Sequence, residues 1–198
     1  MSNEAYQHLL GEHQRLQREH QLLQRLLHLF AAPDEFELVF EGLMDATMEF
    51  FEAHAGSLYM IDGEVGELYF AAARGPAADQ LLKLDITIPP GKGIAGACFK
   101  NREVIAVSEA HKDPRFAKEV SEKIGYEVRS MLTMPIVVDG EALGVLQVIN
   151  KKGESLFGPE EIELATKLGR YAGGLIALGL ELQAADAAAA AAAAQQEA

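Results

Sequence analysis

The sequence is poor in cysteine and in basic residues. Its one cysteine, Cys98, excludes an internal disulfide and any metal site built from several thiolates, and such usage suits a reducing cytosol. Acidic residues outnumber basic ones so far that the formal net charge is −13. This charge argues against a nucleic-acid partner and against an anionic membrane surface, because both select basic faces.

Long apolar runs are also absent. The most apolar stretch near the C-terminus runs only from Tyr171 to Leu180, whereas a bilayer-spanning helix needs about 20 residues. The first residues lack the apolar segment of a signal peptide. With 49% hydrophobic and 24% charged residues, the composition is that of a soluble protein, and 198 residues suffice for one domain with some chain left over. We expect a cytoplasmic protein.

Apolar residues recur at heptad spacing in the first 32 residues. Two rows of period seven are present: Leu9, Leu16, Leu23 and Phe30, and Tyr6, His13, His20 and Leu27. They are the d and a positions of a coiled coil, so residues 1–32 are predicted to form a helix that pairs with a second copy of the chain. His13 and His20 would set the register of this pairing or, alternatively, loosen the dimer when protonated.

Residues 33–182 have the pattern of an α+β domain. Pro33 is expected to end the first helix, and Asp34 to cap the next one. Six short β runs follow, mainly in antiparallel order, and Asp139-Gly140 supplies the positive φ angles of a tight hairpin. The predicted strands are 56–62, 66–73, 82–88, 103–107, 130–138 and 141–150.

A last helix is predicted from Glu160 onward. Its apolar residues, at steps of three and four, form a second pairing seam: Leu164, Leu168, Tyr171, Leu175, Leu178 and Leu182. Residues 183–198 are an alanine-rich tail, which is helix-prone but has no large side chains to anchor it. We expect this tail to fray.

A glycine-rich loop follows the third predicted strand. Gly91, Gly93 and Gly96 fit the G-x-G-x-x-G pattern of dinucleotide-binding turns. A dinucleotide fold needs a full crossover helix before the next, parallel strand. Here the next β run begins near Val104, which leaves room for one or two helical turns. The glycines therefore indicate a tight turn and a short helix lying close to the sheet.

Four segments resemble a GAF domain in their order and spacing: GSLYMID, IPPGKGIAGACFKNREVIAVSEAHKDPRF, SMLTMPIVVDGEALGVLQVINK and FGPEEIELATKLGRYAG. GAF domains are small-molecule sensor modules, and the resemblance covers about residues 34–180. It implies a six-stranded antiparallel sheet with helices on both faces, a ligand pocket on one side, and long terminal dimerisation helices.

Within this family the sequence is most similar to the GAF domains of cyclic-nucleotide phosphodiesterases. Asn150, Lys151 and Phe157 match their signature, and Glu161 takes the position of its aspartate. The resemblance implies that this element ties the last strand to the helices.

The resemblance also implies which residues contact a ligand. Ser57, Ile94 and Ala95 agree with cyclic-nucleotide binders, and Gln147 stands where a glutamate meets the base. Other positions have lost polar side chains, and an unpaired buried polar group costs about 1–3 kcal/mol. A less polar ligand, or none, therefore fits these side chains better than cAMP or cGMP. The candidate residues are Ser57, Ala73, Arg74, Ile94, Ala95, His111, Asp113, Arg115, Phe116, Ala117, Ser121, Ile124, Val128, Thr133 and Gln147.

Two groups of residues admit a second interpretation. His111, Asp113 and Arg115 either cap a loop or contact a ligand. Cys98 is interpreted as a small core residue, with a redox thiol or chromophore anchor as the alternative. The free methionine sulfoxide reductases of this family use several cysteines, which this chain lacks. No catalytic set and no metal site is predicted, and the cofactor is unknown.

Three functions are compatible with these features. The first is a non-catalytic sensor that binds a small molecule and signals through its dimer helices. The second is a cyclic-nucleotide receptor, and the third is a structural dimerisation module with an empty pocket. The expected partners are a second copy of the chain, a small-molecule ligand and a separate output protein, with neither nucleic acid nor membrane.

Overall fold

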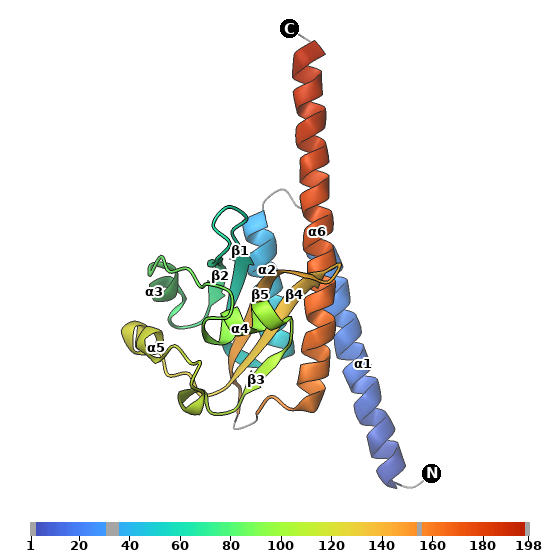
Figure 1. The fold of residues 1–198 in the computed structure, drawn as a ribbon. Coiled ribbons are helices and arrows are strands. Elements are labelled where there is room, and N and C mark those ends of the chain that lie inside the picture. The colour runs from blue at the N-terminus through green and yellow to red at the C-terminus, as the bar shows by residue number, and fades with distance from the viewer. Residues whose placement is uncertain (1–2, 31–35, 154–155, 197–198) are drawn as a thin grey trace.

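The computed structural model describes residues 3–30, 36–153 and 156–196. In these ranges the helices are α1 (Asn3–Phe30), α2 (Phe36–Phe50), α3 (Ala78–Leu82), α4 (Gly93–Asn101), α5 (Lys118–Ile124) and α6 (Pro159–Gln196), with a 3-10 turn at Ala110–Lys112. The strands are β1 (Ala53–Ile61), β2 (Leu68–Arg74), β3 (Ile105–Val107), β4 (Met131–Val138) and β5 (Glu141–Lys151). The N-terminal part of α1 and the C-terminal part of α6 extend from the domain in opposite directions (Figure 1).

The sheet has five strands in the order β2-β1-β5-β4-β3, and each pairs antiparallel with its neighbours. The prediction of a sixth strand at residues 82–88 is wrong. Leu82 ends α3, and only an isolated bridge joins Ile88 to Leu68 among the described residues. Asp85 has a left-handed φ of 45°, and Pro89 follows the segment directly. Both features interrupt an extended strand.

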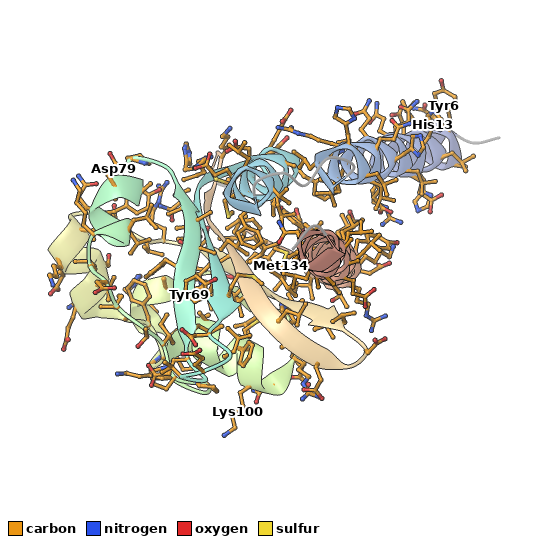
Figure 2. All side chains as sticks on the ribbon, turned by 90° about the horizontal axis from the view of Figure 1, so that it is seen from above. Tyr6, His13, Tyr69, Asp79, Lys100 and Met134 are labelled. Atoms are coloured by element: carbon orange, nitrogen blue, oxygen red, sulfur yellow. The ribbon has the colours of Figure 1, made fainter. Side chains whose placement is uncertain are left out.

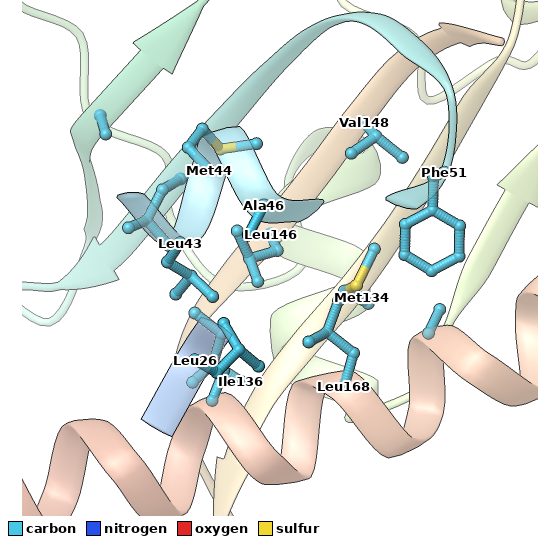
Figure 3. Packing of buried hydrophobic residues seen from close by; sticks show 14 of the residues in the cluster. Leu26, Leu43, Met44, Ala46, Phe51, Met134, Ile136, Leu146, Val148 and Leu168 are labelled. Carbon is cyan, nitrogen blue, oxygen red and sulfur yellow. The ribbon is translucent and has the colours of Figure 1, made fainter. Parts of the chain in front are cut away.

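One face of the sheet is covered by α2 and α6 and is closely packed. Side chains from both helices, from β4 and β5, and from the C-terminal half of α1 form its core. Its buried members include Leu26, Leu43, Met44, Met134, Ile136, Leu146, Val148 and Leu168 (Figure 3). The predicted arrangement of helices on both faces is confirmed, because α4 packs on the opposite face.

Helix α6 lies directly against the backbone of β4. A Cβ atom at Gly169 would lie 2.1 Å from the carbonyl oxygen of Pro135, and one at Gly173 would lie 2.2 Å from that of Val137. Real side chains do not tolerate such distances, so these two positions require glycine. The next residue, Gly174, faces open space.

The turns and helix ends test further predictions. Asp139 and Gly140 have φ angles of 50° and 82°, which confirms the tight hairpin between β4 and β5. Pro33 and Asp34 lie outside the described residues. The alanine-rich tail does not fray as expected but continues α6 to Gln196, because alanine is the strongest helix former. Among the helices of the described ranges, none has the length and apolarity that a membrane crossing requires.

Candidate ligand-binding site

The second face of the sheet carries a cavity of about 640 Å³. Helices α3, α4 and α5 all lie on this side of the domain (Figure 1). Most of the lining is aliphatic or aromatic: Tyr59, Phe70, Leu81, Ile86, Ile88, Ile94, Phe116, Val120, Ile124, Tyr126, Val128, Met131 and Ile149. A cavity of this size and character suits a small organic molecule.

A row of polar side chains runs across the sheet, and two of its members form the floor of the cavity. Ser57, Gln147 and Thr133 are paired across β1, β5 and β4 and therefore share one face of the sheet. All three are buried, and Thr133 is 0% exposed. Gln147 Nε2 donates to Thr133 Oγ1 at 2.9 Å, and its Oε1 accepts from the Tyr59 hydroxyl at 3.4 Å. These bonds fix the orientation of the Gln147 amide. The second N–H of its Nε2 and a further lone pair of its Oε1 remain available.

Tyr59 connects this polar row to an aromatic wall. Burial raises the pKa of Tyr59 to about 12, although its hydrogen bond with Ser57 acts in the opposite direction. The hydroxyl is therefore neutral near pH 7 and able to donate. Its ring lies against Phe70, with the two ring centroids 4.6 Å apart.

Two guanidinium groups at the cavity are held by carboxylates. Arg74 Nη2 lies 2.8 Å from Glu41 Oε2, and its Nε lies 2.9 Å from Asp45 Oδ1, so α2 binds this side chain. Arg115 donates from its Nε and Nη2 to the two oxygens of Asp113 at 2.9 and 2.7 Å, and this bond holds the pKa of Asp113 below its usual range. Carboxylates of the chain therefore already neutralise both guanidinium charges before a ligand enters the cavity.

The segment that covers the cavity is tied to the sheet by Asn150. Its Oδ1 accepts from the backbone N–H of Arg129 at 2.7 Å, and its Nδ2 donates to the carbonyl oxygen of Glu127 at 2.8 Å and to the Tyr126 hydroxyl at 3.3 Å. Asn150 is buried and adopts a left-handed φ of 57°. Tyr126 lines the cavity, so this one side chain joins the end of β5 to the cavity wall.

The next residue, Lys151, binds the start of α6. Its ammonium forms an ion pair with Glu161 and lies 5.8 Å from the ring centroid of Phe157. Burial disfavours the Glu161 carboxylate, but Lys151 and the N–H of Gly158 together hold its pKa below its usual value. The tie between last strand and helices that the resemblance implies is therefore present.

Most of the candidate residues come together at this cavity. Eleven of them line it: Ser57, Arg74, Ile94, Ala95, Arg115, Phe116, Ala117, Ser121, Ile124, Val128 and Gln147. The other four lie outside the lining. Ala73 pairs with Ser57 and Thr133 with Gln147 at the edges of the polar row. His111 is exposed in the 3-10 turn, and Asp113 also accepts from the backbone N–H of Arg115, as a loop cap does.

Sequence reasoning missed a large part of the lining. The missed residues include Tyr59, Phe70, Leu81, Ile86, Ile88, Tyr126, Met131 and Ile149. Strand alternation carries a signal for some of them, since Tyr59 follows Ser57 by two residues and Ile149 follows Gln147 by two. Strand alternation cannot place Ile86, because residues 82–88 were expected to form a strand and do not form one.

The glycine loop forms the predicted short helix. Helix α4 spans Gly93–Asn101, and β3 then pairs antiparallel with β4, so no dinucleotide crossover is present here. Gly91 and Gly93 adopt positive φ angles of 87° and 68°, as a tight turn requires. Gly96 serves a different contact from the expected one. A Cβ there would lie 2.5 Å from the carbonyl oxygen of Pro89, so this glycine accommodates its own loop, not the sheet.

Cys98 and the acidic side chains offer little reactive chemistry. Cys98 is 0% exposed beside Leu68 and Val145, and burial raises the pKa of its thiol to about 12, so it fits the core interpretation. Within the part of the chain that the structure describes, no three His, Cys, Asp or Glu side chains are grouped to hold a metal ion. What the arrangement offers is binding of a mainly apolar molecule with one hydrogen-bonding edge.

Solved structures with the same fold extend these observations. The GAF domain of a phosphoenolpyruvate-protein phosphotransferase from Coxiella burnetii has a TM-score of 0.71 at 22% identity and covers 85% of this chain and 98% of its own. Free methionine-R-sulfoxide reductase from Neisseria meningitidis, solved in complex with its substrate, has a TM-score of 0.66 at 19% identity and covers 83% and 91%. At such identities the likeness shows the fold.

Sequence comparison identifies the family. The cGMP-specific 3',5'-cyclic phosphodiesterase of Drosophila melanogaster is 32% identical over 132 residues, which is 61% of this chain but only 12% of that protein. A family model described as the GAF domain matches residues 35–176. That range is well over half of the chain and contains the whole cavity lining. The chain therefore belongs to the GAF domain family.

Proposed function

We propose that this GAF domain is a non-catalytic sensor, which binds a small molecule in the cavity and passes its occupancy to the terminal helices. The observation that carries the proposal is the cavity of about 640 Å³, because the opposite face of the same sheet is filled by side chains. An apolar cavity with a few convergent buried polar groups is the usual form of a small-molecule site. A cytoplasmic location is part of the proposal and rests on the single buried cysteine.

The lining supports a ligand with a mainly apolar body and one polar edge. Ser57 and Gln147 offer hydrogen bonds at the floor, where a matching ligand edge would replace lost water contacts. Arg74 and Arg115 already bind carboxylates. An anionic ligand would have to compete with these carboxylates for the two arginines, and Lys92 is the further cation of the lining that it could meet. The proposal therefore takes a neutral molecule as the ligand on the ground of the mainly apolar lining.

The route to the helices is proposed to run through the end of β5. Occupancy would shift the covering segment at residues 113–128, whose C-terminal end is held by Asn150. Lys151, the neighbour of Asn150, holds the first turn of α6 through Glu161. A ligand that prefers one position of the cover would therefore bias the packing of α6, which a separate output protein would read.

Native mass spectrometry of freshly purified protein tests the sensor proposal. A bound molecule that dissociates from the protein on collisional activation supports the sensor proposal, and its mass identifies the ligand. Val128→Trp should abolish the bound mass, because it adds bulk to the cavity wall. Val65→Trp is the control, since Val65 is exposed in the β1–β2 turn. Bare protein, with no thermal shift against a library of metabolites, would favour the structural module with an empty pocket.

A cyclic-nucleotide receptor is the second candidate, and the 32% identity to the cGMP-specific phosphodiesterase favours it. Thermal-shift measurements with cGMP and cAMP decide between the two candidates. Because the cavity is lined mainly by apolar side chains, we expect neither nucleotide to raise the melting temperature. A saturable shift that Gln147→Ala removes would replace the apolar-ligand proposal with the cyclic-nucleotide one.

A further inference from the structure

The buried amide of Gln147 is held from both sides of its strand. Tyr59 belongs to β1 and Thr133 to β4, and these strands are the two neighbours of β5 in the sheet. The Tyr59 hydroxyl donates to Oε1 of Gln147 at 3.4 Å, and Nε2 of Gln147 donates to Oγ1 of Thr133 at 2.9 Å. The amide oxygen is therefore directed toward β1 and the amide nitrogen toward β4.

Strand pairing explains how Thr133 reaches this amide. Thr133 lies opposite Gln147 in the β4–β5 ladder, and its neighbour Met134 packs in the core between the sheet and α6 (Figure 2). Because successive residues of a strand point to opposite faces, Thr133 is directed to the cavity face. It is 0% exposed and lies outside the cavity lining, so its hydroxyl contacts Gln147 and would not contact a ligand.

The two bonds leave the outer edge of the amide open. A primary amide has two N–H groups and an oxygen with two lone pairs. Tyr59 and Thr133 engage one of each from the flanks, so one N–H and one lone pair remain side by side at the end of the Gln147 side chain. Gln147 lines the cavity, where a ligand would meet this edge.

We propose that this edge recognises a neutral cis-amide, as a lactam ring or a carboxamide carries, and that Tyr59 and Thr133 are the positioning residues that orient Gln147 for it. A cis-amide presents an N–H beside a carbonyl oxygen, so it matches the open edge with two parallel hydrogen bonds. A carboxylate would bring a charged oxygen against Oε1 of Gln147 in a buried place. The inference rests on the proposed sensor function and names the chemical class of its ligand.

The wall beside the amide favours a flat ring as the body of this ligand. Tyr59 and Phe70 line the cavity with their ring centroids 4.6 Å apart, and Tyr59 also contacts Gln147. Flat aromatic molecules pack well against such rings. A lactam fused to an aromatic ring, 2-quinolinone, is therefore a suitable probe. Coumarin is its matched partner, because a ring oxygen replaces the N–H and the shape is retained.

Isothermal titration calorimetry of the full chain with both probes tests the recognition of the edge. We expect the wild type to bind 2-quinolinone about tenfold more tightly than coumarin, because the ring oxygen of coumarin would meet a lone pair of Gln147 in place of a hydrogen bond. Gln147→Leu should bind the two probes about equally, since it keeps the bulk and loses the edge. Equal affinities in the wild type, or no binding of 2-quinolinone, would overturn the proposal.

Thr133→Val tests the positioning role. Since Thr133 lies outside the lining, the loss of its hydroxyl acts through the orientation of Gln147. The preference for 2-quinolinone should fall to about threefold or less, with the circular dichroism of the wild type retained. Thr47→Val is the matched control: it removes another fully buried hydroxyl, which donates to the Leu43 carbonyl oxygen within α2, and should leave the preference unchanged. A preference that survives Thr133→Val would refute the positioning role.

Two further outcomes separate this inference from the sensor proposal. Guanine carries the same lactam edge, so binding of cGMP without binding of 2-quinolinone would assign the affinity to the ribose phosphate and overturn the inference. A co-purifying molecule that has no amide group would also overturn it, but would leave the sensor function intact. Protein that is bare in native mass spectrometry and binds none of the probes would overturn both.

Discussion

Leu146 and Gln147 are neighbours on β5, yet they meet opposite surroundings. Leu146 is 0% exposed among side chains of α2, β4 and α6, whereas Gln147 lies on the floor of a cavity of about 640 Å³. The same strands thus carry a filled face and a hollow one. Because close packing on one face supplies much of the stability, the other face can leave volume open for a ligand.

The two faces should therefore respond differently to the same kind of change. On the filled face, a lost side chain leaves a cavity whose walls cannot collapse. On the hollow face, a lost side chain enlarges a space that already exists. Truncation of a side chain should therefore cost more unfolding free energy on the filled face than on the hollow face.

Phe51→Ala should cause the largest loss. Phe51 is 2% exposed on the filled face, and its ring meets Phe50 edge-on with centroids 5.0 Å apart. Truncating a buried phenylalanine costs about 3–5 kcal/mol of unfolding free energy. Urea unfolding followed by circular dichroism measures the change. A loss below about 1 kcal/mol would show that this face is not closely packed.

Gly173→Ala should come next, because the added methyl group meets the β4 backbone. Its Cβ would lie 2.2 Å from the carbonyl oxygen of Val137, so α6 must move away from the sheet. Such overpacking costs about 1–3 kcal/mol. Gly174→Ala is the control at the adjacent residue, where the new Cβ meets open space, and it should stabilise the helix by up to about 1 kcal/mol. Equal melting temperatures for the two variants would contradict the close approach of α6 to β4.

The difference between the faces was only partly predictable from sequence. Strand periodicity and the Asp139-Gly140 turn predict β4 and β5, because these signals are local. The segment at residues 82–88 resembles a strand by the same local rule, but the positive φ of Asp85 prevents a sixth strand. That backbone conformation at Asp85 has no signature in the pattern of apolar residues along this segment.

The candidate site shows the same limit. The family resemblance named Ser57 and Gln147, and both residues line the cavity. It could not show that the Arg74 guanidinium binds Glu41 and Asp45 on α2. This contact joins elements far apart in the sequence, and side-chain direction at the end of β2 decides it.

Glu161→Gln should produce a smaller loss, and one that depends on pH. The ion pair with Lys151 is partly exposed, so we expect a loss of about 1–2 kcal/mol at pH 7. The folded-state pKa of Glu161 lies below its ordinary value of 4.5. The contribution is therefore complete above that value and is lost as the pH falls through the folded-state pKa. Urea unfolding at pH 7 and in acid measures both effects.

The control for this prediction is Glu163→Gln, two residues further along α6 at an exposed position. Glu163 pairs with Lys167 at the surface, where a salt bridge contributes little. Its removal should leave the unfolding free energy nearly unchanged at both pH values. If Glu161→Gln and Glu163→Gln behave alike, the tie between β5 and α6 is no stronger than a surface pair.

Phe116→Ala should cause the smallest loss, although it removes the same side chain as Phe51→Ala. Phe116 is half-buried in the cover, and the open cavity leaves part of its ring without contacting atoms. Fewer dispersion contacts are lost, so the unfolding free energy should fall by less than about 1 kcal/mol. Hydrogen exchange of residues 113–128 should nevertheless accelerate, because local opening of the cover becomes easier. A loss as large as that of Phe51→Ala would mean that the cavity face is packed like the core, and the contrast between the two faces would not hold.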